Sequence, residues 1–198
     1  MQQAAARQIL DEAMTGDIVL FAGRGLVSGT IRLFTRSRWT HVGMVLRGDD
    51  GELLLLESTN TDEAPDTVLG RPVRGVQVVR LAEKLAAYDG AVALRRLELD
   101  ERPPAFDEAV RDIALLWRYR GYKDFTATLL LDLLSANRRP QRVHRLFCSE
   151  LVAETYKRLG IMCRKVRSSR YVPGDFARDQ PAFLTAARLA PPVLIKSP

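Results

Sequence analysis

Residues 39–57 read Trp39-Thr-His-Val-Gly-Met-Val-Leu-Arg-Gly-Asp-Asp-Gly-Glu-Leu-Leu-Leu-Leu-Glu57. Two mostly apolar runs flank Gly48-Asp-Asp-Gly51, whose glycines and aspartates favour a tight turn, so these residues predict a β-hairpin. Apolar runs at 17–21, 76–80 and 91–97 predict further strands. We therefore expect a mostly antiparallel sheet.

Helical spacing of apolar residues predicts helices before and after these strands. They are expected at 3–14, 25–34, 82–87, 103–118, 125–134 and 147–159. Strands in the first half followed by helices indicate the α+β class. The 198 residues, 46% of them hydrophobic, are enough for one domain over 1–198, with 98–146 as a helical insertion before the last long helix.

Cys148 lies at the expected start of that helix, within Leu146-Phe-Cys-Ser-Glu-Leu-Val152. The unpaired N–H groups and the dipole at a helix N-terminus favour an anion, so a cysteine there tends to ionise to the nucleophilic thiolate. The same N–H groups can stabilise the oxyanion that forms when a carbonyl is attacked. The alternative is a core cysteine packed between Phe147 and Leu151, and this segment alone does not decide between the two.

A nucleophilic thiol needs a base, and the chain has two histidines. His41 lies in an apolar strand, where a side chain on the helix-facing side could meet the helix of Cys148. His144 lies in an arginine-rich loop, whose positive charge opposes protonation of the imidazole. We therefore favour His41 as the base; the alternative for His41 is a core histidine with satisfied hydrogen bonds.

Glu57 ends the apolar run 53–56, and a carboxylate at a buried sheet position needs a partner. His41 is the obvious one, and the carboxylate would then orient the imidazole. Direct cross-strand pairing requires facing residue numbers that sum to 98, which a loop of three or five residues allows. A sum of 99 puts the two residues on opposite faces. A solvent-exposed carboxylate at the strand end is the alternative.

Three segments together resemble a known family. They are Gly16-Asp-Ile-Val-Leu-Phe21, Ser37-Arg-Trp-Thr-His-Val-Gly-Met-Val45, and Phe147-Cys-Ser-Glu-Leu-Val152 with Tyr156 and Gly160. Their order is similar to that in circularly permuted members of the NlpC-type papain-like superfamily, which includes YiiX-like bacterial proteins and lecithin:retinol acyltransferase-like enzymes.

The resemblance implies a permuted papain-like fold in which the histidine strand precedes the cysteine helix. It assigns Cys148 as nucleophile, His41 as general base and acid, and Glu57 as the residue that orients His41. Gly121-Tyr-Lys-Asp124 is similar to the tyrosine-bearing segment before the cysteine helix, which makes Tyr122 a pocket residue.

Thr40 and Ser149, which adjoin the histidine and the cysteine, are predicted with that tyrosine to bind substrate. The expected reaction is hydrolysis of an amide bond in a peptide or acyl-amide substrate, through an acyl-enzyme. The alternatives are a lipid acyltransferase or thioesterase-like enzyme at a membrane surface, and a non-catalytic binding module of the same fold. The apolar run 129–134 beside several arginines suits an anionic lipid surface, unless it packs in the core.

Composition and residue spacing narrow the possible partners, cofactors and location of the protein. The net charge of +6 comes from scattered basic residues, so no nucleic-acid partner is expected. His41, His144, Cys148 and Cys163 match no common zinc spacing, and we predict neither a metal nor a cofactor. With no apolar signal segment and no membrane-length apolar run, the expected location is the cytoplasm, including the periphery of a membrane. The sequence does not indicate an oligomeric state.

Overall fold

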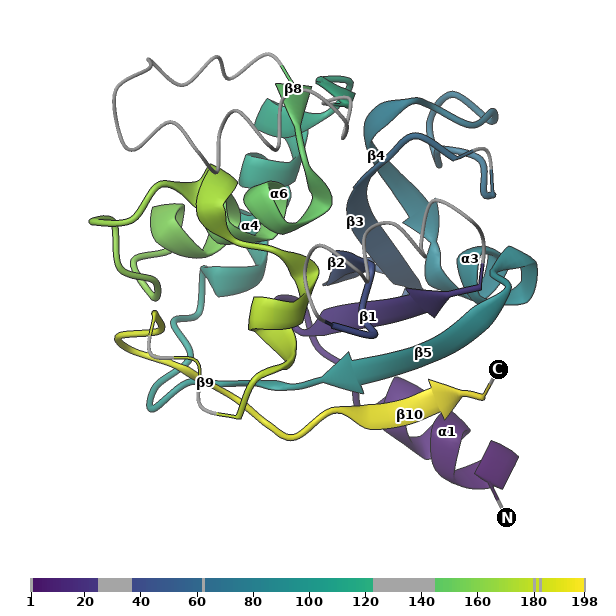
Figure 1. The fold of residues 1–198 in the computed structure, drawn as a ribbon, viewed down its shortest axis with the longest axis horizontal. Helices are drawn as coiled ribbons and strands as arrows, with labels where there is room; N and C mark the ends of the chain where they lie inside the picture. The colour runs from purple at the N-terminus through teal and green to yellow at the C-terminus, as the bar shows by residue number, and fades with distance from the viewer. Residues whose placement is uncertain are drawn as a thin grey trace.

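The computed structural model describes residues 2–24, 37–61, 63–122, 145–179, 181 and 183–197. Its centre is a six-stranded sheet in the order β10-β5-β1-β2-β3-β4 (Figure 1). These strands are β1 (Ile18–Gly23), β2 (His41–Arg47), β3 (Leu53–Thr59), β4 (Gly75–Arg80), β5 (Gly90–Arg95) and β10 (Val193–Lys196). Every neighbouring pair is antiparallel, which confirms the predicted α+β class with a mostly antiparallel sheet.

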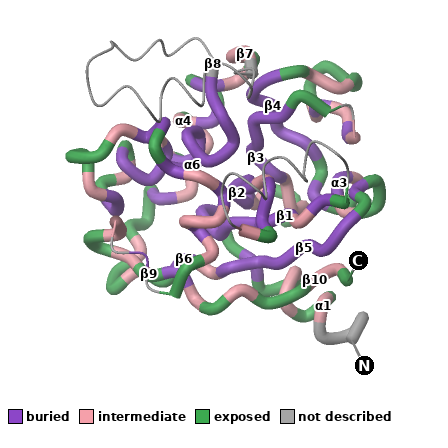
Figure 2. Tube along the Cα trace, viewed as in Figure 1, coloured by how far each residue is buried: buried purple, intermediate pink, exposed green. Residues whose placement is uncertain are grey.

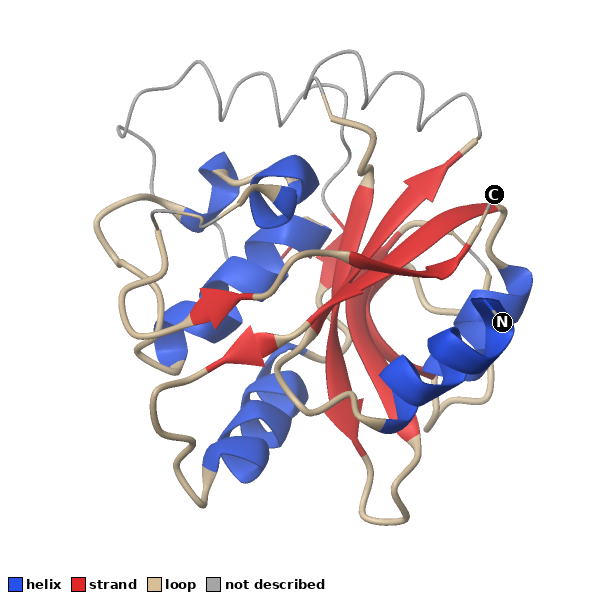
Figure 3. Cartoon of the chain, turned by 90° about the horizontal axis from the view of Figure 1, so that it is seen from below, coloured by secondary structure: helices blue, strands red, loops and turns tan. Residues whose placement is uncertain are grey.

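Helices lie on both sides of this sheet (Figure 3). α4 (Phe106–Trp117) and α6 (Cys148–Arg158) lie on one side, and α1 (Gln2–Asp11) and α3 (Leu81–Ala87) on the other. The smaller elements are the pair β6 (Leu97–Glu98) with β9 (Arg188–Leu189), the parallel pair β7 (Gly121–Tyr122) with β8 (Arg145–Leu146), and the 3-10 turns η1 (Ser168–Arg170) and η2 (Pro173–Ala177).

Strand alternation divides the core into two clusters. Val42 and Met44 of β2 pack with α4 and α6, whereas Val45 belongs to the cluster on the α1 and α3 side. Because both faces of the sheet are covered, the central strands are buried along most of their length (Figure 2). This two-sided burial explains why 18–21 and 53–56 read as unbroken apolar runs instead of alternating ones.

The hairpin register differs from the one we expected. Met44 faces Leu56, so facing residue numbers sum to 100, and the direct pairing that required a sum of 98 is wrong. The loop spans 48–52, and the Gly48 N–H donates to the carbonyl of Glu52 at its neck. An even sum still keeps His41 and Glu57 on one face, as diagonal neighbours across the hairpin.

Two further differences from the sequence expectations concern element ends and a short strand. α1 ends at Asp11, before the expected end at residue 14, and the Arg47 guanidinium binds the Asp11 and Ala13 carbonyls beyond it. β10 was not predicted, because it has only four residues and half of them are exposed. The expected helices at 25–34 and 125–134 lie outside the described residues. Within 98–146, α4 is described, and it packs in the same core as α6.

Across the described parts of the chain, no helix has both the length and the apolar character needed to cross a membrane.

Candidate active site

Cys148 is the first residue of α6, and the segment before it is anchored to the sheet. The Ser58 hydroxyl of β3 donates to the Leu146 carbonyl at 2.7 Å. The Phe147 N–H donates to the Glu150 carboxylate, which caps the start of the helix. The sulfur accepts hydrogen bonds from two backbone N–H groups, and the residue is only 5% exposed. The local sequence therefore fixes the thiol at a helix N-terminus, as predicted.

The Cys148 thiol is hydrogen-bonded to the His41 side chain. His41 faces Phe21 directly across β1 and β2, and their rings lie 5.3 Å apart between centroids. Since Phe21 belongs to the α3-side cluster, His41 lies on that side of the sheet and not on the side that α6 covers, so the expected side is wrong. The two side chains still meet because α6 begins beside the start of β2, where the Val42 N–H donates to the sulfur.

Glu57 holds the other side of the imidazole. Its Oε2 lies 2.7 Å from His41 Nε2, and the residue is fully buried, so a solvent-exposed carboxylate is excluded. An ionised carboxylate only accepts hydrogen bonds, so Nε2 carries the proton and Nδ1 is the nitrogen left for the thiol. The predicted contacts of Cys148, His41 and Glu57 are thus confirmed; their catalytic roles stay a prediction.

Two further side chains bind the same carboxylate, and sequence reasoning missed both. Gln77 Nε2 of β4 and Lys84 Nζ of α3 donate to Glu57 Oε1 at 2.9 and 3.0 Å. Lys84 also contacts the Glu63 carboxylate at 2.6 Å and is 1% exposed. These two carboxylates outweigh the effect of burial, so the pKa of Lys84 lies above its ordinary value and the amine is protonated.

The sequence did carry a weak signal for each of them. Lys84 continues the buried i, i+3, i+4 stripe that Leu81 and Leu85 define on α3, where an apolar residue is the usual choice. Gln77 interrupts the valines of β4 and faces Glu57 directly in the register.

The charges of the cluster shift its pKa values in a consistent way. Burial alone lowers the pKa of His41, but the Cys148 sulfur and the Glu57 carboxylate raise it to about 9. Burial alone raises the pKa of Glu57, but the charge of Lys84 and the hydrogen bond from His41 lower it to about 2. Burial likewise raises the pKa of the Cys148 thiol, while His41 and two backbone N–H groups bring it below its ordinary value. The site therefore favours a thiolate–imidazolium pair.

The predicted substrate-binding residues have different surroundings. The Thr40 hydroxyl donates to the Phe21 carbonyl and is also hydrogen-bonded to the hydroxyl of Tyr88. Burial raises the pKa of Tyr88 to about 12. The Ser149 hydroxyl is buried and donates to the Tyr171 carbonyl at 2.6 Å, so its proton is already engaged.

Tyr122 lies in β7, where its backbone pairs with Leu146 just before the cysteine helix. The Tyr122 side chain and all of His144 lie outside the described residues. Substrate binding by any of the three predicted residues stays a prediction. Within the described ranges, no three or more His, Cys, Asp and Glu side chains are grouped so that they could hold a metal ion.

Comparison with solved structures finds a shared fold. The chain is similar to the crystal structure of metalloprotein yiiX from Escherichia coli O157:H7, with a TM-score of 0.54, 14% sequence identity, and coverage of 94% of this chain and 98% of that one. This supports the predicted likeness to YiiX-like proteins at the level of fold. No family model matches the chain. No curated protein matches it either.

Proposed function

We propose that this protein is a cysteine hydrolase of the permuted papain-like class that cleaves an amide bond in a peptide or N-acyl substrate. The observation that carries this proposal is the unbroken series of contacts from Cys148 through His41 to Glu57. A thiol, an imidazole and an orienting carboxylate in that order are the groups that acyl transfer by a cysteine nucleophile requires.

The first half of the reaction forms an acyl-enzyme. The Cys148 thiolate attacks the substrate carbonyl carbon, and the carbonyl oxygen becomes an oxyanion near the first N–H groups of α6, which lack intrahelical acceptors. The His41 imidazolium gives its proton to the leaving nitrogen as the C–N bond breaks. The amine leaves, and a thioester to Cys148 remains.

The second half returns the enzyme to its starting state. His41, now neutral, takes a proton from water as the water oxygen attacks the thioester carbonyl. The C–S bond breaks, the carboxylic acid product leaves, and the proton on His41 restores the thiolate–imidazolium pair. Glu57 remains ionised throughout and keeps Nε2 as the donor, so Nδ1 always faces the sulfur and the substrate.

The charge state of His41 favours an amide over an ester as substrate. An amine leaves readily only when its nitrogen is protonated, whereas an alkoxide or phenoxide needs less help. With the His41 pKa raised to about 9, the imidazole is protonated at neutral pH and can supply this proton.

Thiol alkylation tests the proposal. With iodoacetamide at pH 6 to 9, we expect Cys148 to react fast already at pH 6 to 7, and the half-exposed Cys163 to react slowly with a rate that rises with pH. Mass spectrometry of the two cysteine peptides gives both rates from one sample, so Cys163 is the internal control.

The His41→Ala variant removes the partner that lowers the pKa of Cys148. Its Cys148 rate at pH 7 should fall at least tenfold and should then rise with pH, while the Cys163 rate stays unchanged. Slow labelling of Cys148 in the unmodified protein, with the same pH dependence as Cys163, would instead identify a non-catalytic binding module.

A matched pair of substrates then tests the reaction. Hydrolysis of an N-acyl p-nitroanilide that is lost in both Cys148→Ala and His41→Ala supports an amidase. Release of p-nitrophenol from the matching ester with no turnover of any anilide would contradict the assignment of an amide bond.

A further inference from the structure

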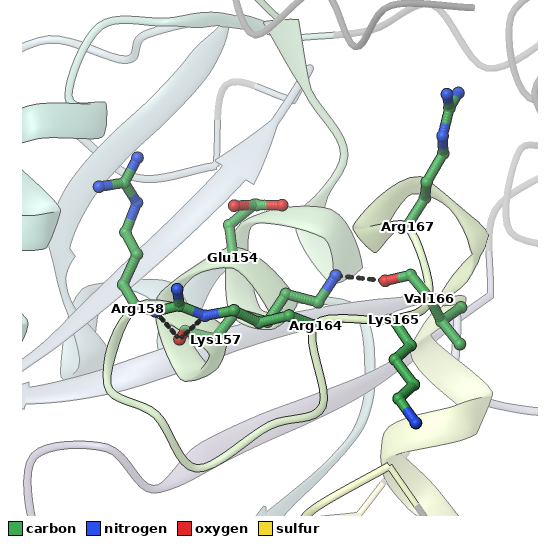
Figure 4. A pocket seen from close by; sticks show the side chains of 7 residues that line it. All are labelled: Glu154, Lys157, Arg158, Arg164, Lys165, Val166 and Arg167. Carbon is green, nitrogen blue, oxygen red and sulfur yellow. Dashed lines mark hydrogen bonds between the residues drawn. The ribbon is translucent and has the colours of Figure 1, made fainter. Parts of the chain in front are cut away.

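A hollow lies at the opposite end of α6 from Cys148. Its volume is about 440 Å³, within the ~300–1,000 Å³ typical of ligand pockets. Glu154, Lys157 and Arg158 line it from the last turns of α6, and residues 164–167 line it from the loop that follows (Figure 4). Because α6 has 11 residues, the two ends lie about 15 Å apart at 1.5 Å per residue. The hollow is thus separate from the candidate active site.

The lining of this hollow is strongly cationic. It contains two lysines and three arginines but a single carboxylate, that of Glu154. Even without Lys165 and Arg167, whose charged groups both point away from the others in Figure 4, three cations remain, those of Lys157, Arg158 and Arg164. Glu154 accepts a hydrogen bond from the Ser168 hydroxyl, so part of its capacity is already used.

Several of these cations donate to neutral oxygens and not to carboxylates. Lys157 Nζ donates to the Val166 carbonyl and, at 2.7 Å, to the Ser168 hydroxyl. Arg164 donates through Nε and Nη2 to the Lys157 carbonyl at 3.2 and 3.1 Å. Among the described residues, neither Lys157 nor Arg164 forms a salt bridge that would neutralise its charge.

A structural explanation accounts for only part of this charge. Cations in the last turn of a helix stabilise its C-terminal dipole, which is equivalent to about half a negative charge. Lys157, Arg158 and Arg164 against one carboxylate leave a surplus of about two positive charges, more than the half charge that the dipole balances. Three of the five cationic residues also come from the loop and not from the helix itself.

Lys157 shows that the surplus is held at a cost to stability. The residue is 7% exposed, and burial lowers the pKa of its amine, an effect that nearby carboxylates only partly oppose. A buried ammonium group without a close counterion is unfavourable, and an anion in the hollow would relieve this.

We propose that this hollow is a binding site for a phosphate-bearing anion. The lining residues of α6 and of the following loop carry guanidinium and ammonium groups, which are the usual donors to phosphate oxygens in proteins. The shared ligand chemistry is the phosphate group, supplied either by a free phosphate compound or by the headgroup of an anionic lipid. The proposal does not depend on catalysis at Cys148.

The test compares the two sources of phosphate on the full-length protein. One arm titrates inorganic pyrophosphate by calorimetry at constant ionic strength, with chloride as the balancing anion. The other measures cosedimentation with phosphatidylcholine vesicles that contain or lack phosphatidic acid. Each is repeated with the double variant Arg158→Gln/Arg164→Gln, in which glutamine at 164 can still donate to the Lys157 carbonyl.

The matched control is Arg170→Gln/Arg188→Gln, which removes the same charge from exposed positions outside the hollow. We expect binding of pyrophosphate, or of the phosphatidic acid vesicles, to weaken at least tenfold in the first double variant and less than threefold in the control. Binding in the pyrophosphate arm identifies a free phosphate ligand, and binding to vesicles alone identifies a lipid headgroup.

The proposal is overturned if neither probe binds the unmodified protein, or if the control variant loses as much binding as the first. Iodoacetamide labelling of Cys148 is measured on the same samples. Rapid labelling in both double variants shows that the fold and the distant thiol are intact, so failure of the anion site and failure of the hydrolase proposal give different results.

Discussion

Replacement of Lys84 by methionine tests whether the buried lysine controls the charge of Glu57. Methionine is similar in size and unbranched, so Lys84→Met removes the ammonium group while it keeps most of the packing. The Nζ to Oε1 distance of 3.0 Å corresponds to an attraction of about 5 kcal/mol at an effective dielectric constant of ~20. Removal of one member of a buried ion pair costs about 3–5 kcal/mol of stability, because the remaining charge is left buried without a partner.

A loss of that size is easily measured. For a chain of about 200 residues, 1 kcal/mol shifts the melting temperature by about 2–4 °C, so Lys84→Met should lower it by roughly 10 °C at pH 7.5. The exposed Lys165→Met is the control and should change it by less than about 2 °C. Differential scanning calorimetry on both variants gives the comparison.

The pH dependence identifies Glu57 as the cause. Its pKa of about 2 in the folded protein lies below the ordinary 4.5, so its ionisation contributes about 3 kcal/mol of stability, present above pH 4.5 and lost as the pH falls through 2. Without Lys84, burial raises this pKa, so Glu57 takes up a proton at higher pH. The deficit of Lys84→Met should therefore be largest at pH 7.5 and smaller at pH 4.

The double variant Lys84→Met/Glu57→Gln removes the unpaired charge as well as the pair. It should recover at least half of the stability that Lys84→Met loses at pH 7.5. The reasoning is refuted if Lys84→Met has the same melting temperature as the unmodified protein, or if its loss of stability is independent of pH. It is also refuted if the stability losses of the two single substitutions add in the double variant.

Three further substitutions separate structural from catalytic contributions. Glu57→Gln removes a charge that raises the pKa of His41, so this pKa, measured by NMR titration, should be lower than in the unmodified protein. An unchanged pKa contradicts the assigned contact. Ser149→Ala leaves the buried Tyr171 carbonyl without its donor and should cost about 1–2 kcal/mol in urea unfolding, with Cys148 labelling unaffected. Gly90→Ala places a Cβ about 2.2 Å from the Ala22 carbonyl oxygen at a φ of +148°, and should cost more than about 3 kcal/mol by the same assay; a smaller loss would show that β1 and β5 can separate there.

The His41–Glu57 contact could be predicted although the register could not. Sequence reasoning considered a sum of 98 for facing residues, and the actual sum is 100. A shift of two leaves every side chain on its own face, because side chains alternate with a period of two. The contact survives as a diagonal one, which a hydrogen bond of 2.7 Å between two long side chains can span.

Lys84 could not be assigned in the same way. A lysine on the apolar stripe of a short helix commonly extends its amine to solvent, and local sequence does not distinguish this from burial. The amine of Lys84 turns inward because it contacts Glu57 and Glu63. These residues lie 27 and 21 positions earlier in the sequence and come close to α3 only in the folded chain. β10 was missed for a related reason, since its four residues, two of them exposed, become a strand only because β5 offers a free edge.

The buried charges themselves weigh against a purely structural role for Cys148 and His41. A cysteine and a histidine that served only to fill the core would need no ionised carboxylate beside them. Glu57 is fully buried, and it stays ionised because the charge of Lys84 lowers its pKa. Replacement of a buried ion pair by well-packed apolar groups is often neutral or stabilising by 1–4 kcal/mol. A fold selected for stability alone therefore gains little from this series of alternating charges. What the series does supply is a fixed tautomer of His41 and a lowered thiol pKa at a helix N-terminus, and both properties matter for nucleophilic chemistry and not for packing.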